Sequence, residues 1–159
     1  MATSPASTWA ARYWRELQRQ PAAEHQYASL LGLRSFDPAE LHARVEQGLA
    51  FETLERLRDV LDLPLTRFAE LVRIPSRTLG RRRDAGRLDP DESDRLLRLA
   101  RIVGLTLRLF EGDLERTRVW LMKPHAAFGG ESPLSFSTTE VGARAVEHVI
   151  GRLEHGIPL

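Results

Sequence analysis

The stretch from Leu65 to Arg87, LTRFAELVRIPSRTLGRRRDAGR, restricts the fold most, because a helical pattern stops there at a proline and resumes at once. Apolar residues recur at helical spacing from Leu65 to Val72, which predicts an amphipathic helix. Pro75 disfavours the helical conformation at the residue before it, so a turn is expected at this point. Ser76 can accept hydrogen bonds from free amides, and it is the expected cap of a second helix over about Arg77–Ala85.

This second helix has one clear apolar residue, Leu79, and is otherwise rich in arginine. At about 100° per residue, Arg77 and Arg81 lie on the side away from Leu79, with Thr78 beside them. A packed first helix followed by an exposed basic helix is typical of a helix-turn-helix, whose second helix enters the DNA major groove. The alternative is a solvated basic face on an ordinary helical protein. The residues expected to contact DNA are Ser76, Arg77, Thr78, Arg81, Arg82, Arg83, Arg73 and Arg87.

Arg82 and Arg83 have a second interpretation, because the same projection places them nearer the core edge of the helix. Acidic residues open the next helix nearby, at Asp91, Glu92 and Asp94. The planar guanidinium group binds carboxylates through two parallel hydrogen bonds. At least one of the two arginines could therefore hold a structural ion pair instead of contacting DNA.

Helical periodicity continues along the rest of the chain, and no segment alternates with period two, which predicts an all-α fold. Asp37 and Asp89 each precede a proline and a glutamate, which indicates capped helix starts. The helix after Asp89 is expected to end at Val103, just before Gly104. The other expected helices cover residues 8–19, 38–47, 51–61, 114–122 and 140–153.

Three large aromatic residues, Trp9, Tyr13 and Trp14, fall on the expected N-terminal helix and need a cover. The body of the same chain is one cover. A subunit contact is the other, because exposed aromatic patches usually mark partner surfaces. The segment Gln20–Glu24, which contains a proline, is interpreted as a linker.

Composition limits the chemistry that the chain can perform. The 159 residues include no cysteine and carry a net charge of +1. No two-histidine zinc pattern, nucleophile elbow, Walker loop or dinucleotide fingerprint is present, so no metal, no cofactor and no catalysis are expected. The pair Gly129-Gly130 is interpreted as a turn, since no strand precedes it. No apolar run has the length of a membrane span and no signal pattern opens the chain, so a cytoplasmic protein without a membrane partner is expected.

Several ordered motifs resemble a known family. They are RTLGRRRDAGRLDPDESDRLLRLARI (residues 77–102), LFEGD (109–113), WLMKP (120–124), FGGESPL (128–134) and TEVGARAVEHVIGRLEHG (139–156). Together they resemble the Xre/ParS-type antitoxins of bacterial RES–Xre toxin–antitoxin systems, over about residues 30–159. Gly80 departs from the pattern, because a small helix-forming residue is expected at that position.

The resemblance implies two functional domains, here called the two working parts, that follow an N-terminal extension. The extension covers residues 1–29, a helical bundle with the helix-turn-helix covers 30–104, and a small helical toxin-binding domain covers 105–159. The first part would bind the promoter of its own operon, as a homodimer because such repressors read two-fold sites. The second would bind a cognate RES-domain toxin that attacks NAD, so the chain would neutralise an enzyme without catalysis of its own.

The end of the sequence suggests how neutralisation works. A glycine breaks the last helix, and Ile157, Pro158 and a terminal carboxylate follow. Such an apolar tip could enter the NAD pocket of the toxin, its anion meeting a basic group there. The alternative is a frayed terminus. The residues expected to contact the toxin are Leu153, His155, Gly156, Ile157, Pro158 and Leu159.

Two other functions fit the same residues. One is a stand-alone transcription factor whose C-terminal part senses a ligand or a partner. The other is a toxin-binding module that no longer uses its helix-turn-helix on DNA.

Overall fold

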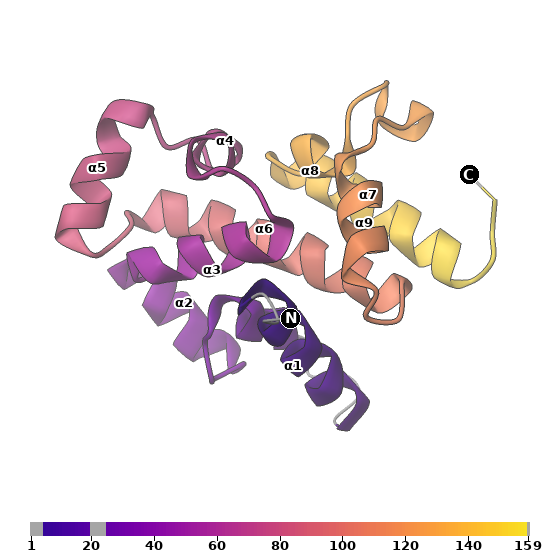
Figure 1. Cartoon of the computed structure of the whole chain (residues 1–159), viewed down its shortest axis with the longest axis horizontal. Helices are drawn as coiled ribbons and strands as arrows, with labels where there is room; N and C mark the ends of the chain where they lie inside the picture. Colours follow the sequence, from indigo (N-terminus) through magenta and orange to yellow (C-terminus); the bar gives the residue numbers. More distant parts are fainter. Residues whose placement is uncertain (1–4, 20–24, 159) are drawn as a thin grey trace.

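The computed structural model describes residues 5–19 and 25–158, and every extended regular element in these ranges is a helix (Figure 1). The all-α prediction is therefore confirmed. The N-terminal half contains α1 (Pro5–Arg19), the 3-10 helix η1 (Gln26–Leu31), α2 (Pro38–Gln47), α3 (Phe51–Leu61), α4 (Leu65–Leu71) and α5 (Ser76–Ala85). The C-terminal half contains α6 (Pro90–Leu109), α7 (Leu114–Met122), the 3-10 helix η2 (Ala126–Phe128), α8 (Pro133–Phe136) and α9 (Glu140–Glu154).

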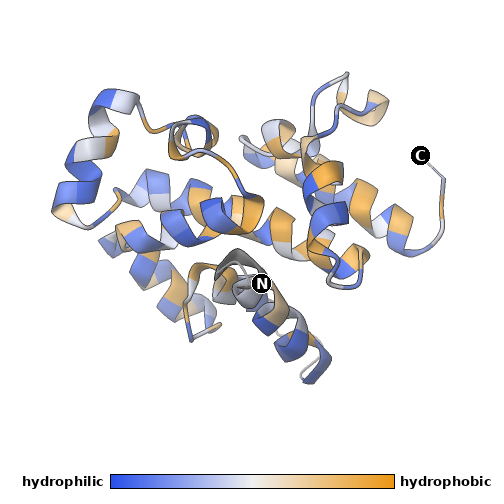
Figure 2. Cartoon of the chain, in the orientation of Figure 1, coloured by the Kyte–Doolittle hydropathy of each residue, from blue (hydrophilic) through white to orange (hydrophobic). Residues whose placement is uncertain are grey.

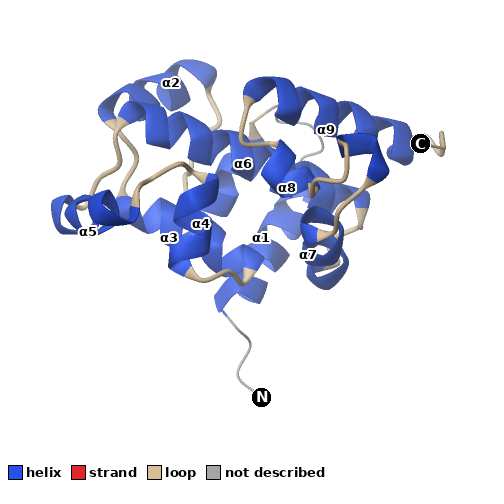
Figure 3. Ribbon diagram, turned by 90° about the horizontal axis from the view of Figure 1, so that it is seen from above, coloured by secondary structure: helices blue, strands red, loops and turns tan. Residues whose placement is uncertain are grey.

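The long helix α6 runs through the middle of the molecule (Figure 1). It contacts η1 and α2 from the N-terminal half and α7 and α9 from the C-terminal half. Viewed from above, α5 lies at one end of the molecule and α7 and α9 at the other (Figure 3). Helix α6 therefore forms the common axis on which both halves pack.

The prediction that this helix ends at Val103 is wrong, because α6 continues to Leu109. Gly104 lies buried inside the helix, with α1 and η1 packed close against it. A Cβ at this position would lie 2.7 Å from the Tyr13 hydroxyl oxygen and 2.8 Å from the Tyr27 Cβ. The glycine therefore permits a close helix contact; it does not end a helix. Helix α6 is also continuous across residues 104 and 105, where the two working parts were expected to meet.

One hydrophobic core extends through both halves, from Ala10 of α1 to Ile150 of α9. Tyr13 is buried in this core, and desolvation raises the pKa of its hydroxyl group. Trp9 is half-buried, with the Arg56 guanidinium carbon 4.8 Å from the centre of its ring. The ring of Trp14 packs against Gly112. The interpretation that the body of the same chain covers these aromatic residues is confirmed.

Several elements begin or occur where the sequence pattern did not predict them. Helix α1 begins at Pro5, and the short helices η1, η2 and α8 had no periodic signal of their own. Gly129 and Gly130 do form a turn, with φ angles of 64° and 87°. The expected linker Gln20–Glu24 lies outside the described residues. Within the described ranges, no helix combines the length and the apolar character needed to cross a membrane.

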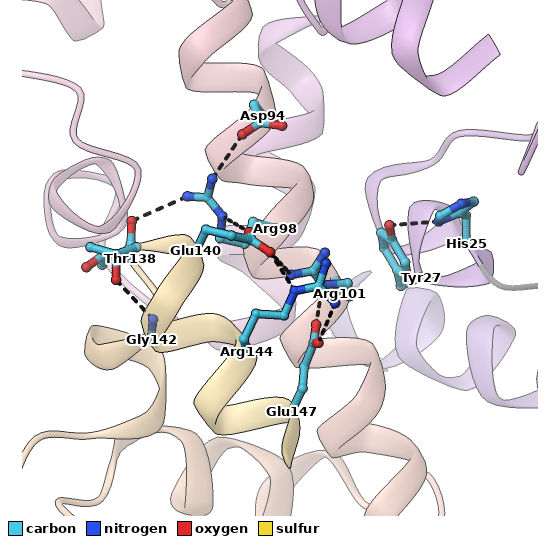
Figure 4. Close-up of polar contacts among 11 residues, drawn as sticks. His25, Tyr27, Asp94, Arg98, Arg101, Thr138, Glu140, Gly142, Arg144 and Glu147 are labelled. Atoms are coloured by element: carbon cyan, nitrogen blue, oxygen red, sulfur yellow. Dashed lines mark hydrogen bonds and ion pairs between the residues drawn. The ribbon is translucent and has the colours of Figure 1, made fainter. Parts of the chain in front are cut away.

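Ion pairs join the central helix α6 to α9 along their contact (Figure 4). Glu140 accepts a 2.9 Å hydrogen bond from Arg98 Nε and a 3.3 Å hydrogen bond from Arg101. Arg101 also pairs with Glu147, about two turns of α9 further on. Nearer the end of α9, both oxygens of the Glu154 carboxylate accept hydrogen bonds from Arg108, at 2.9 and 3.1 Å.

This network predicts a small loss of stability in acid. Burial alone would raise the pKa of Glu140, but the hydrogen bonds and charges of Arg98 and Arg101 outweigh it and lower that pKa below its ordinary 4.5. A lowered carboxyl pKa stabilises the folded state at neutral pH, and this contribution disappears as the pH falls through the folded-state pKa. The Glu140 side chain is 47% exposed, so we expect the contribution to remain below about 1 kcal/mol.

Glu140→Gln measures this contribution. Urea unfolding should give a difference in unfolding free energy between wild type and variant at neutral pH that shrinks as the pH falls below about 4. A difference that stays constant over this range would contradict the assignment.

Candidate functional site

Helices α4 and α5 pack at an angle around a short, well-defined turn. Phe68 and Ala69 of α4 and Leu79 of α5 are buried. After α4 the chain turns at Arg73, whose φ is 57°, and the Ile74 amide donates to the Ala69 carbonyl at 2.9 Å. The helix-turn-helix predicted for residues 65–87 is therefore present as two helices held by buried side chains and backbone hydrogen bonds.

The predicted cap of α5 is wrong. Helix α5 begins at Ser76, and the residue before it, Pro75, occupies the cap position without a side-chain hydrogen bond. The Pro75 carbonyl accepts hydrogen bonds from the amides of Thr78 and Leu79, at 2.8 and 3.1 Å. Proline already has the extended ψ, 142°, that a residue before a helix needs, so α5 starts one residue earlier than expected. Ser76 is exposed on the first turn, and its contact with DNA stays a prediction.

The far end of α5 is held to the connection between α2 and α3. The Phe51 amide donates to the Gly86 carbonyl at 3.0 Å, and the Leu88 amide donates to the Leu49 carbonyl at 2.9 Å. Arg87 donates to the Gln47 carbonyl at 2.9 Å, so part of its guanidinium group is engaged within the protein. These bonds fix the direction in which α5 projects.

Arg82 performs the structural role that was considered for it. Its side chain is only 15% exposed, and Nε donates to the carboxylate of Glu92, which is 7% exposed, at 2.8 Å. A second bond reaches Asp89, and the hydrogen bond to Glu92 is the main reason why the pKa of Arg82 is raised. The ion-pair interpretation is confirmed for Arg82. Arg83 is exposed, and its guanidinium carbon lies 5.5 Å from the centre of the Phe51 ring.

The side chains of three arginines on this surface make no ion pair, hydrogen bond or ring contact with the described residues. Arg73, Arg77 and Arg81 are exposed, and none of them makes an ion pair with the part of the chain that the structure describes. Figure 2 shows α5 as a mostly hydrophilic helix beside the mixed helix α6. Thr78 is half-buried and lies less outward than the sequence projection suggested. We call Arg73, Arg77 and Arg81 the free arginines.

The C-terminal half carries an ordered aromatic loop beside α7. The buried ring of Phe128 meets the ring of Trp120 edge to face at 6.4 Å. His125 Nε2 lies 3.2 Å from the Trp120 carbonyl oxygen, and the His125 backbone amide donates to the Glu131 carbonyl at 3.0 Å. The sequence indicated a turn here but gave no sign that the aromatic side chains would pack together.

The tail after α9 is described up to Pro158 and is hydrogen-bonded to the end of the helix. Gly156 has a φ of 67° and its amide donates to the Leu153 carbonyl at 3.0 Å. The Ile157 amide donates to the Arg152 carbonyl at 2.9 Å, which completes the paired hydrogen bonds of a Schellman motif. The Arg152 side chain also donates to the Pro158 carbonyl.

The predicted toxin-contact residues are therefore close together at one end of α9. Leu153 packs against the core, and His155 is exposed with Nδ1 2.7 Å from the Gly151 carbonyl oxygen. Ile157 is 48% exposed. Leu159 lies outside the described residues. The Ile157 amide and the Pro158 carbonyl are both hydrogen-bonded to Arg152, which argues against the frayed-end alternative for these two residues.

The fold and the α4–α5 surface define a helix-turn-helix protein with a second helical part on its central helix. Residues 40–101 match the family described as the antitoxin Xre-like helix-turn-helix domain, and residues 106–156 match the antitoxin Xre/MbcA/ParS C-terminal toxin-binding domain. The chain belongs to the Xre antitoxin family.

Curated relatives cover most of the chain. A protein named Antitoxin Xre from Yersinia enterocolitica is 34% identical over 128 residues, which is 80% of this chain and 86% of the relative. Antitoxin Xre from Photorhabdus laumondii is 30% identical over 128 residues, 80% of this chain and 86% of that protein. Antitoxin Xre from Pseudomonas putida is 33% identical over 121 residues, 76% of this chain and 74% of that protein.

Proposed function

We propose that the chain neutralises a cognate RES-domain, NAD-targeting toxin by covering its active site with the tail after α9, and that it represses its own operon through α5. Membership of the Xre antitoxin family and the match to a toxin-binding domain support a toxin as the partner. Both proposed partners, operator DNA and toxin, place its action in the cytoplasm.

The observation that carries the proposal is the shape of the tail. The Schellman hydrogen bonds and the Arg152 side chain hold Ile157 and Pro158 in one conformation beyond the end of the helix. Because these hydrogen bonds restrict the segment before a partner binds, they would lower the conformational entropy lost on binding. The apolar side chain of Ile157 is half-exposed, so a cleft in a partner can bury it further.

The free arginines support the proposal of DNA binding. A guanidinium group without a carboxylate partner can bind guanine edges or phosphates without first breaking an ion pair. Arg82, by contrast, fixes α5 through Glu92, so we assign it a positioning role. A repressor of this kind reads a two-fold site, and we therefore expect it to act as a homodimer.

The tail is tested by removing Gly156–Leu159 and, separately, by Ile157→Asp. Both variants should still co-purify with the product of the adjacent gene, because most of the C-terminal domain is unchanged. The concentration needed to inhibit NAD consumption by that product should, however, rise at least tenfold. In Ile157→Asp, burying the new carboxylate in an apolar cleft costs several kcal/mol of binding free energy, and in the truncated chain the tail is absent. NAD consumption by the purified complexes is the measurement.

Val141→Asp is the matched control, since Val141 is an apolar residue at the other end of α9 and is 84% exposed. We expect it to inhibit like wild type. Full inhibition by a toxin-bound truncated chain would reject the covering tail while leaving the toxin partnership intact.

A further inference from the structure

Four glycines lie inside helices of the described chain without a positive φ angle: Gly80, Gly104, Gly142 and Gly151. Internal packing requires two of them. A Cβ at Gly104 would meet Tyr13 and Tyr27, and a Cβ at Gly142 would lie 1.8 Å from the Phe136 carbonyl oxygen. At Gly80 and Gly151, however, an added Cβ would have no neighbour within 4 Å.

Gly80 therefore serves no purpose that is visible within the fold. Glycine lowers the stability of a helix relative to alanine, because the unfolded chain has more conformations to lose. The backbone of α5 at Gly80 has ordinary helical angles and open space outside it, so alanine would fit and stabilise the helix. A close contact with a partner outside the chain would give this glycine a purpose.

The residues around Gly80 indicate which kind of partner could contact it. At about 100° per residue, Gly80 lies between Arg77 and Arg83 on the exposed side of α5, with Asp84 and Arg81 next to it. All of these residues are exposed, and Arg77 and Arg81 are two of the free arginines. The missing side chain leaves the helix backbone bare at the centre of the surface that carries these groups.

Asp84 restricts the partner further. A carboxylate repels a phosphate placed beside it, whereas it can accept a hydrogen bond from the amino group of a cytosine. The centre of this surface therefore suits base edges in a groove, and the arginines on its sides suit guanines or the flanking phosphates.

We propose that Gly80 is the point at which the base edges of the operator lie against the backbone of α5. This inference rests on the proposed DNA binding and adds its closest contact. A methyl group at residue 80 would hold the helix away from the groove floor, so that Arg77 and Arg81 would lose the geometry of their base contacts. Phosphate contacts, which tolerate such a shift, would change little.

The test compares wild type, Gly80→Ala and Gly151→Ala. Gly151 is the matched control, because it is also a helical glycine with open space but lies on α9, in the other half of the molecule. Both variants should raise the melting temperature by about 2–4 °C, the usual effect of a helical glycine-to-alanine change in a chain of this size. Binding is measured by titration with the DNA directly upstream of the gene and with an unrelated duplex, at one salt concentration.

We expect Gly80→Ala to bind the upstream DNA at least about tenfold more weakly, with unchanged binding to the unrelated duplex, since one base contact contributes about a factor of ten or more. Gly151→Ala should bind both like wild type. If the stabilised Gly80→Ala protein bound the upstream DNA as tightly as wild type, the inference would be overturned while DNA binding stood. If wild type did not prefer the upstream DNA at all, both proposals would be overturned.

Discussion

Replacing Arg77 and Arg81 together by alanine lowers the affinity for the upstream DNA by about a hundredfold, the effect expected for two lost base contacts of about 1–3 kcal/mol each. Both side chains are exposed and neither holds an ion pair with the described residues, so the melting temperature should hardly change. The measurement is a titration at fixed salt, repeated with an unrelated duplex. The loss should be larger for the upstream DNA than for the unrelated duplex if the arginines contact bases.

The control removes the same amount of charge elsewhere. Arg116 and Lys123 are exposed residues at the two ends of the α7 region, remote from α5 in the sequence and in the fold (Figure 1). Their double alanine variant should bind the upstream DNA within a few-fold of wild type. An equal loss in both double variants would mean that overall charge, and not the surface of α5, accounts for the binding.

The second large effect is expected at Gly48. Gly48→Ala should lower the free energy of unfolding by about 2–4 kcal/mol, because strained backbone and a steric overlap add together. Gly48 has a φ of 84°, and a Cβ there would lie 2.1 Å from the Leu88 carbonyl oxygen. Relief of this overlap would separate the two backbone segments that fix the end of α5. Chemical denaturation of the purified variant measures the loss.

Gly86→Ala isolates the backbone contribution. Gly86 also has a positive φ, 69°, but nothing lies within 4 Å of an added Cβ. We expect it to cost only about 1–2 kcal/mol, the usual penalty for a side chain in the left-handed region. An equal loss in the two variants would show that the Leu88 carbonyl is not the obstacle.

Local signals in the sequence predicted a helix boundary correctly where the boundary depends only on residues within one turn of it. Asp37 caps α2 and Asp89 caps α6 as expected, since a short acidic side chain, a proline and a glutamate act within one turn. Gly104 could not be interpreted in this way. Its role depends on Tyr13 and Tyr27, which are distant in the sequence, so a glycine that permits packing resembled one that ends a helix.

In the candidate site, too, features that depend on local residues were predictable and features that depend on distant residues were not. The periodicity of α5 predicts that Arg77 and Arg81 face outward, and the structure places them there. Whether Arg82 pairs with an acid or faces solvent depends on how α5 meets the start of α6, and sequence spacing left both outcomes open. The order of the tail likewise depends on Arg152 reaching forward to Pro158, a contact that no motif predicts.

The continuity of α6 has a consequence for regulation. Within the described residues, one uninterrupted helix, a shared core and the Arg98–Glu140 and Arg108–Glu154 pairs leave no hinge between the end that we propose to bind the operator and the end that we propose to bind the toxin. A toxin bound to the chain would therefore be held at a constant distance and angle from the bound operator DNA. The toxin would then affect transcription by steric exclusion, according to whether toxin-bound copies of the chain can still occupy adjacent sites on the promoter.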